Sequence, residues 1–233
     1  MPRDLLFTKE QVLDAALALT REKGFAAVSA RSLGEQLGTT SRPIFSHFKT
    51  MADVQKAIVE AANDLYQSFR AREIADGKYP PYKASGMAYI RFARDEKELF
   101  KLLFMRDRSQ ETVKDDPEEM DALIGLVGKQ VGIDREAAGL FYREMWAYTH
   151  GIAAMIATGY ADWDEILAAR ALTDVYEGLR WRYRNGGSGH DRGKTDHQSL
   201  RHRREQDGGP QRDRPADRGR RFRRDLGGIR LGK

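Results

Sequence analysis

The sequence predicts an all-α protein, with an N-terminal three-helix region followed by a C-terminal helical bundle and about nine helices in total. Through residues 8–184, apolar residues recur at spacings of three and four, which is the period of an amphipathic helix. No segment alternates apolar and polar residues as a half-buried strand does. With 233 residues, of which 40% are hydrophobic, the chain has enough apolar material for a sizeable core.

The first helix is predicted to begin directly after Thr8. The run from Thr8 to Gln11 has the form of a capping box, in which each side chain satisfies a free amide of the other residue. An apolar stripe from Val12 to Leu19 follows. Gly24 is a natural helix stop, because glycine adopts the left-handed conformation that often ends a helix.

Two short helices are predicted next. Ser29 is a suitable N-cap for a helix over residues 30–37, and Gly38 ends it. Thr40 is then expected to cap a third helix over residues 41–48. Two short helices that are joined by a tight glycine-containing turn, and braced by a longer helix before them, form a helix-turn-helix.

Six further helices are predicted from residue 51 onward. The penultimate one has Asp134 as a good N-cap, and the last one begins at Asp162 or Asp164. The last helix carries an apolar stripe that either packs within one subunit or forms an interface: Leu172, Val175, Tyr176, Leu179 and Tyr183. The expected ranges are 51 to beyond 69, 84–94, 96–105, 115–131, 134–158 and 162 or 164 to about 184.

Composition excludes several classes of protein. The chain has no cysteine, so it has no disulfide framework and no thiolate metal site. Neither a signal-peptide pattern nor an apolar run of about 20 residues is present, so we expect a cytoplasmic protein without membrane contact. The net charge of +5 does not by itself indicate nucleic-acid binding, because residues 185–233 carry +7 and residues 1–184 are left with −2.

The segment 185–233 differs from the rest of the chain. Only six of its 49 residues are apolar and ten are glycine, a composition typical of disorder. Three interpretations stay open: an Arg-rich arm that adds nonspecific affinity for phosphate, a simple disordered extension, and a stretch translated out of frame.

The out-of-frame interpretation rests on back-translation. With free codon choice and a shift of one base, residues 190–196 can encode M-I-E-V-K-L-I, and residues 225–233 can encode I-L-G-A-S-G-S-G-K, a phosphate-binding loop. These fragments resemble the two ends of the N-terminal region of an ABC-transporter ATPase. The resemblance suggests a downstream transporter gene as the target of this protein.

Residues 8–54 resemble the DNA-binding domain of the TetR family. The matching pattern runs T-x-x-x-V-L-x-A-A-L-x-L-x-x-x-x-G-F-x-x-x-S-x-R-x-L-G-x-x-L-G-T-T-S-R-P-I-F-S-H-F-K-T-M-x-D-V. The resemblance implies a homodimer on double-stranded operator DNA, with the third helix of each subunit in a major groove. The expected domains are a helix-turn-helix domain at 1–50, an effector-binding and dimerisation domain at 51–184, and the tail at 185–233.

Positions carried over from the family give the DNA contacts. Arg42 is long enough to reach guanine O6 and N7, and Pro43 can offer only an apolar contact. Two departures weaken backbone anchoring: the family's usual tyrosine is Phe45 here, and its usual lysine is Met51. A small solvated helical bundle is the alternative for this segment. The candidate DNA-binding residues are Ser29, Arg31, Thr40, Ser41, Arg42, Pro43, Phe45, His47 and Lys49.

The second domain contains Trp146 and His150 in a W-x-x-x-H-G motif, which resembles a subgroup of TetR C-terminal domains. Aromatic and thioether side chains nearby suit a hydrophobic effector, although such stripes also form ordinary cores. A metal site at His150 is not expected, because no partner ligand has suitable spacing. The candidate effector residues are Tyr89, Phe92, Phe100, Phe104, Met105, Tyr142, Trp146, His150 and Met155.

These observations predict a transcriptional regulator, with repression released by a small and largely hydrophobic effector; an activator would have the same sequence. No cofactor and no metal are expected. An enzyme is disfavoured, because residues 1–184 contain no Gly-rich phosphate loop and no convincing Ser/His/Asp grouping. The alternative from another class is a dimeric interaction protein that has lost or weakened its DNA binding, which Phe45 and Met51 would favour.

Overall fold

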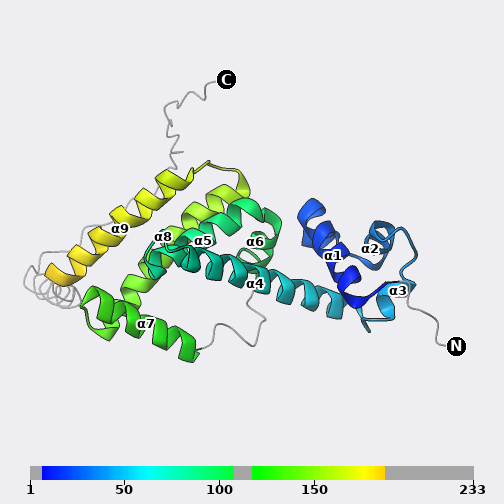
Figure 1. The fold of residues 1–233 in the computed structure, drawn as a ribbon, viewed down its shortest axis with the longest axis horizontal. Helices are drawn as coiled ribbons and strands as arrows, with labels where there is room; N and C mark the ends of the chain where they lie inside the picture. The colour runs from blue at the N-terminus through cyan, green and yellow to red at the C-terminus, as the bar shows by residue number, and fades with distance from the viewer. Residues whose placement is uncertain (1–6, 108–116, 187–233) are drawn as a thin grey trace, which may run out of the picture. The chain divides into compact units, whose positions relative to one another are not determined.

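A computed structural model describes residues 7–107 and 117–186, which contain nine α-helices, one 3₁₀ turn and no strand (Figure 1). This confirms the all-α prediction. The elements are α1 (Lys9–Lys23), η1 (Phe25–Ala27), α2 (Ala30–Gln36), α3 (Arg42–Phe45), α4 (Met51–Asp76), α5 (Pro81–Asp95), α6 (Lys97–Phe104), α7 (Pro117–Val131), α8 (Arg135–Thr158) and α9 (Glu165–Asn185). None of these helices is long and apolar enough to cross a membrane.

Most of the predicted N-cap residues cap a helix in the structure: Thr8, Ser29, Asp134 and Asp164. Oγ1 of Thr8 accepts a hydrogen bond from the Gln11 amide at 3.2 Å, and the Thr8 amide donates to Gln11 at 2.8 Å, so the capping box is present. Ser29 caps α2 in the same way. A third box, between Thr50 and Asp53, went unpredicted, and it starts α4 at the expected residue, Met51.

Helix α3 is shorter than the predicted range 41–48. It spans Arg42–Phe45, and its N-cap is Ser41 rather than Thr40, with no side-chain cap. Beyond Phe45 the amides of Ser46 and His47 bond three residues back, to Pro43 and Ile44, which is the tighter 3₁₀ pattern. The chain therefore leaves the α-helical path early, a few residues before the Thr50 capping box begins α4.

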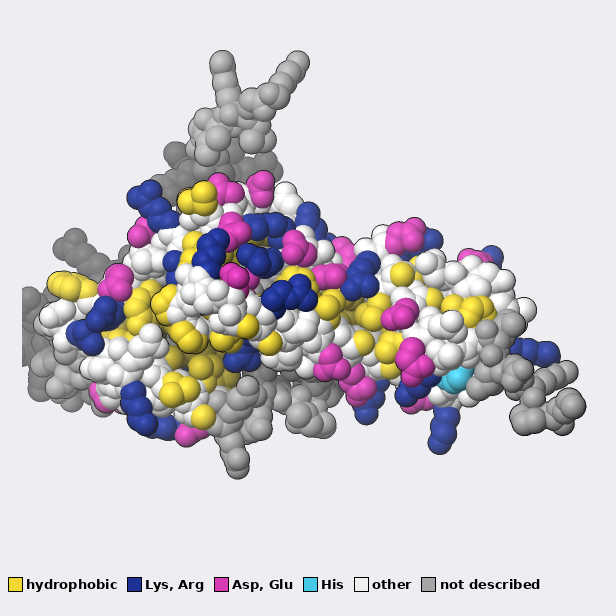
Figure 2. All heavy atoms as spheres, viewed as in Figure 1, with side chains coloured by type: hydrophobic (Ala, Val, Ile, Leu, Met, Phe, Trp, Pro, Cys, Tyr) yellow, Lys and Arg dark blue, Asp and Glu magenta, His cyan; other side chains and the backbone are white. Residues whose placement is uncertain are grey.

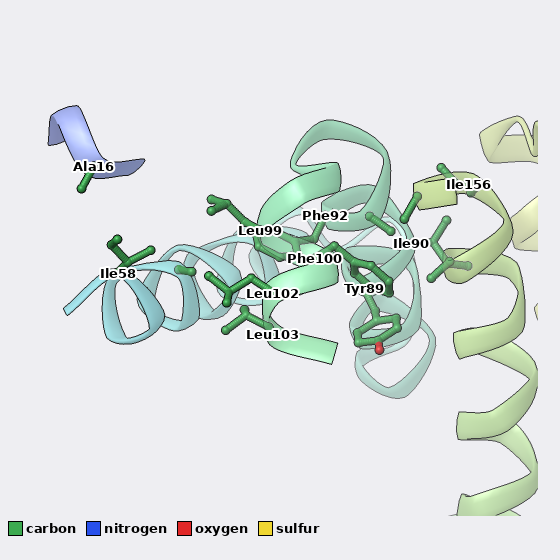
Figure 3. Packing of buried hydrophobic residues seen from close by; sticks show 14 of the residues in the cluster. Ala16, Ile58, Tyr89, Ile90, Phe92, Leu99, Phe100, Leu102, Leu103 and Ile156 are labelled. Atoms are coloured by element: carbon green, nitrogen blue, oxygen red, sulfur yellow. The ribbon is translucent and has the colours of Figure 1, made fainter. Parts of the chain in front are cut away.

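The N-terminal helices α1 to α3, which we call the head, pack on the remaining helices, which we call the body. Within the body, α5 contacts α4, α6, α8 and α9, and α7 packs on α8. Helix α1 contacts both α4 and α6, so head and body share one buried cluster. Figure 3 shows part of it: Leu99, Leu102 and Leu103 of α6 lie between α4 and the aromatic residues of α5.

A second cluster fills the space between α7, α8 and α9. Its buried members are Val127 and Val131 of α7 with Ala138, Phe141 and Met145 of α8. Side chains of α9 pack against it from the outside, including Val175, Tyr176, Leu179 and Tyr183, whereas Leu172 belongs to the larger cluster. The predicted stripe of the last helix therefore packs within one subunit.

Candidate DNA-binding surface and effector cavity

The turn between α2 and α3 passes directly over Gly34. A Cβ atom at this position would lie 3.1 Å from the carbonyl oxygen of Thr39 and 3.2 Å from the amide nitrogen of Ser41. The Thr39 amide donates to the Gly34 carbonyl at 2.9 Å, and Gly38 has φ of +67°. The close turn that presents α3 therefore depends on a glycine within α2 and another just after it.

Replacing Gly34 with alanine is expected to lower the free energy of unfolding by roughly 1–3 kcal/mol, the usual cost of overpacking. The contacting atoms belong to backbone, which cannot rotate away as a side chain can. Urea denaturation followed by circular dichroism measures the change. Gly125→Ala in α7 is the control, because a methyl group added there would have no neighbouring atom within 4 Å; equal stability of both variants would contradict this account of the turn.

Most candidate DNA-binding side chains lie on the outside of the head. Arg42 is exposed and makes no ion pair with any residue in the described ranges 7–107 and 117–186. The side chain of Phe45 is 45% exposed, and Arg31 is held by Glu35 at 2.9 Å. Thr40 and Lys49 are exposed, and Ser41 and Pro43 are partly buried. Figure 2 shows Lys and Arg side chains at the outer end and lower side of the head.

Besides Arg31, two further candidates have partners within the protein. The Ser29 hydroxyl accepts from the Ser32 amide at 3.1 Å as the α2 cap. The Nε2 atom of His47 donates to the carbonyl oxygen of Phe7 at 2.7 Å, so this ring holds the segment that leads into α1. Sequence spacing could not reveal this contact, because the two residues are 40 positions apart.

A cavity of about 760 Å³ lies within the body, a size suited to a small organic ligand. Figure 2 shows hydrophobic side chains gathered on one face of the body. Trp146 lines the cavity and is 51% exposed, so the cavity reaches solvent at this residue. The aromatic lining residues are Tyr66, Tyr82, Tyr89, Phe104, Tyr142, Trp146 and Tyr176.

Four of the nine candidate effector residues line this cavity: Tyr89, Phe104, Tyr142 and Trp146. The other five are not among the residues that line it. Phe92 and Phe100 are fully buried packing residues; the Phe92 ring lies 5.3 Å from that of Phe69, and the Phe100 ring lies 5.1 Å from that of Tyr89. Met105 is 42% exposed outside the cavity, and Met155 packs against the main core.

His150 does not line the cavity but contacts two residues that do, Tyr89 and Trp146. Its Nδ1 atom is hydrogen-bonded to the Tyr89 hydroxyl at 2.8 Å, and its ring stacks on Trp146 with centroids 5.1 Å apart and planes at 9°. Burial lowers the pKa of His150, which favours the neutral ring. No group of three metal-ligating side chains occurs among the residues that the structure describes.

Sequence reasoning missed several lining residues. Tyr66 continues the buried α4 stripe of Val54, Ile58 and Ala62 at four-residue spacing, so the signal was present. Tyr176 belongs to the predicted α9 stripe but turns toward the cavity. The polar members Arg70, Lys83, Arg143 and Glu177 had no periodic signal, because only the meeting of four helices brings them together.

A helix-turn-helix head on a helical body with a ligand-sized cavity defines a ligand-responsive transcriptional regulator. Comparison with known proteins gives the family. The model described as "Bacterial regulatory proteins, tetR family" matches residues 12–63, and that described as "Tetracyclin repressor-like, C-terminal domain" matches residues 82–175. The chain belongs to the TetR family, whose members bind operator DNA and small-molecule effectors, dimerise, and are generally not enzymes.

One similar solved structure is that of the multidrug binding protein EbrR in complex with imidazole. It has 20% sequence identity to this chain and a TM-score of 0.48. The match covers 71% of this chain and 93% of the other.

Proposed function

We propose that this protein is a homodimeric, sequence-specific repressor that leaves its operator when a small and largely hydrophobic effector fills the body cavity. The observation that carries the proposal is the position of α4 and α6. Both helices supply cavity residues, Tyr66 and Phe104, and both also contact α1 of the head. An effector that moves either helix would therefore change the placement of the head.

A paired contact connects the same elements directly. The guanidinium of Arg21 in α1 donates to both carboxylate oxygens of Glu96 at 2.7 and 2.9 Å. Glu96 is the N-cap of α6, and Phe104 at the other end of that helix lines the cavity. Helix α6 thus has the effector site at one end and the head at the other.

Operator binding would use the exposed outer face of the head. Arg42 and Pro43 in α3 would read bases, and Thr40, Ser41 and Lys49 would contact the backbone near them. Gel-shift assays with the DNA upstream of the gene test this function. Saturable binding that resists competitor DNA is expected; weak, sequence-independent binding that disappears at moderate salt would favour the alternative interaction protein.

The dimer would form through α8 and α9. Both helices expose large apolar side chains, including Leu140 (39%), Ile166 (82%) and Trp181 (69%), and burying them in an interface would be favourable. Trp181→Asp is expected to weaken the dimer by about 30-fold or more, because buried tryptophans are frequent interface hot spots. Sedimentation equilibrium measures the change.

The control for the dimer prediction is Leu126→Asp. Leu126 is also exposed (63%), but it belongs to α7 rather than to the expected interface helices. The control is expected to remain dimeric. A wild-type protein that is monomeric at micromolar concentration, or equal effects of both substitutions, would contradict the proposed interface.

A downstream ABC-transporter gene is the proposed target. Support comes only from the back-translated fragments at 190–196 and 225–233, which lie outside the described residues. Reading the nucleotide sequence in the neighbouring frame tests the proposal. An open frame that joins both fragments supports it, and a stop codon between them ends it.

A further inference from the structure

The cavity lining has a repeated composition. Each of three helices supplies one cationic side chain together with tyrosine: α4 gives Tyr66 and Arg70, α5 gives Tyr82, Tyr89 and Lys83, and α8 gives Tyr142 and Arg143. Helix α9 gives Tyr176 and the one carboxylate of the lining, Glu177. The described lining therefore holds three cations and one anion.

The lining cations are not neutralised by carboxylates within the described ranges. The closest polar partner of Arg70 is the neutral amide of Gln67 at 3.4 Å, and Lys83 donates to the Thr173 hydroxyl at 2.7 Å. Glu177 instead pairs with Arg180, which is not a lining residue, at 3.2 Å. The cavity thus keeps an excess of positive charge beside apolar walls, where water screens charge less than in bulk.

The tyrosines add hydrogen-bond donors to this charge. Burial raises the pKa of Tyr66 to about 12 and also raises the pKa values of Tyr82 and Tyr89, so these phenols stay protonated near neutral pH. Together with Tyr142, all three line the same cavity. Tyr66 and Arg70 are four residues apart on α4 and so share one helix face.

We propose that the effector is an anionic amphiphile, with a carboxylate or sulfonate on an aromatic or aliphatic body. This inference rests on the proposed function of the cavity. The anionic group would lie against Arg70 and Tyr66, with Arg143 nearby, and the apolar body would pack on Phe104 and Trp146. A lipophilic cation of the same size would bind poorly, because three like charges face the space that it would occupy.

A matched pair of fluorescent dyes tests the charge preference. 8-Anilinonaphthalene-1-sulfonate is anionic, and N-phenyl-1-naphthylamine is the same fluorophore without the sulfonate; both brighten in apolar sites. The anionic dye is expected to bind the full chain about tenfold more tightly. In Arg70→Gln its dissociation constant should rise about tenfold, as for loss of one charge-assisted hydrogen bond, while that of the neutral dye stays within about twofold.

Controls separate this proposal from the function on which it rests. Arg170→Gln removes an α9 cation that is 79% exposed and paired with Asp174 outside the cavity, and it should change neither constant. If the Arg70→Gln variant does not fold, Arg143→Gln takes its place in the same measurement, with the same expected weakening of anionic-dye binding. Equal binding of both dyes, or no effect of either cavity substitution, overturns the anionic preference but leaves an effector cavity in place. Failure of both dyes to bind contradicts the cavity's proposed role itself.

Discussion

Replacing Arg42 with alanine is expected to weaken operator binding by about 1–3 kcal/mol and to relax base preference at one position of each half-site. Arg42 is exposed at the start of α3 and has no ion pair among the residues that the structure describes. Its guanidinium therefore gains DNA contacts without losing contacts inside the protein. Genome-wide footprinting would supply the operator, and gel shifts with single-base variants would measure the loss.

Two further substitutions locate the effect at this side chain. Arg42→Lys keeps the positive charge but loses the planar pair of donors. Compared with Arg42→Ala, it should regain affinity for the DNA phosphates but should not regain the base preference. Lys56→Ala removes an exposed cation of α4 that is 3.8 Å from Glu60, and it should leave operator binding unchanged. An Arg42→Ala variant with wild-type base preference would remove Arg42 from the reading surface.

The parts of the fold that sequence predicted well depend on neighbours along the chain. The capping boxes at Thr8 and Ser29 involve residues only three positions apart, and the helix stop at Gly24 depends on one residue. The end of α3 was wrong because the amides of Ser46 and His47 bond three residues back rather than four. Apolar spacing does not distinguish such a 3₁₀ turn from a continued α-helix.

The site could be predicted only in part for a different physical reason. Phe100 and Phe104 lie one turn apart on α6, and both are aromatic, but Phe100 is fully buried while Phe104 lines the cavity. Periodicity identifies the inward face of a helix and does not separate a packed interior from a hollow one. Likewise, the sequence left open whether Leu172 packs within one subunit or forms an interface, and the structure places it in the core, whereas Ile166 of the same helix is 82% exposed.

Breaking the Arg21–Glu96 contact is expected to uncouple the cavity from the head. The pair joins α1 to the N-cap of α6 with two hydrogen bonds, and Glu96 is only 15% exposed. Coupling free energies between sites are typically about 1–3 kcal/mol, which corresponds to a roughly 5–150-fold change in affinity. Glu96→Gln should reduce this change to about twofold or less, with little loss of operator affinity in the absence of ligand.

Coupling between two binding sites is reciprocal: if the ligand changes the affinity for DNA by a given factor, DNA changes the affinity for the ligand by the same factor. The coupling can therefore be measured from either side. Titrating the tighter of the two dyes with and without operator DNA gives that factor for wild type, Glu96→Gln and Arg21→Gln. Glu60→Gln, which disrupts the exposed Lys56 pair within α4, is the matched control and should retain full coupling. If both variants of the Arg21–Glu96 pair also retained it, the shared packing of α1 on α4 would have to carry the signal instead.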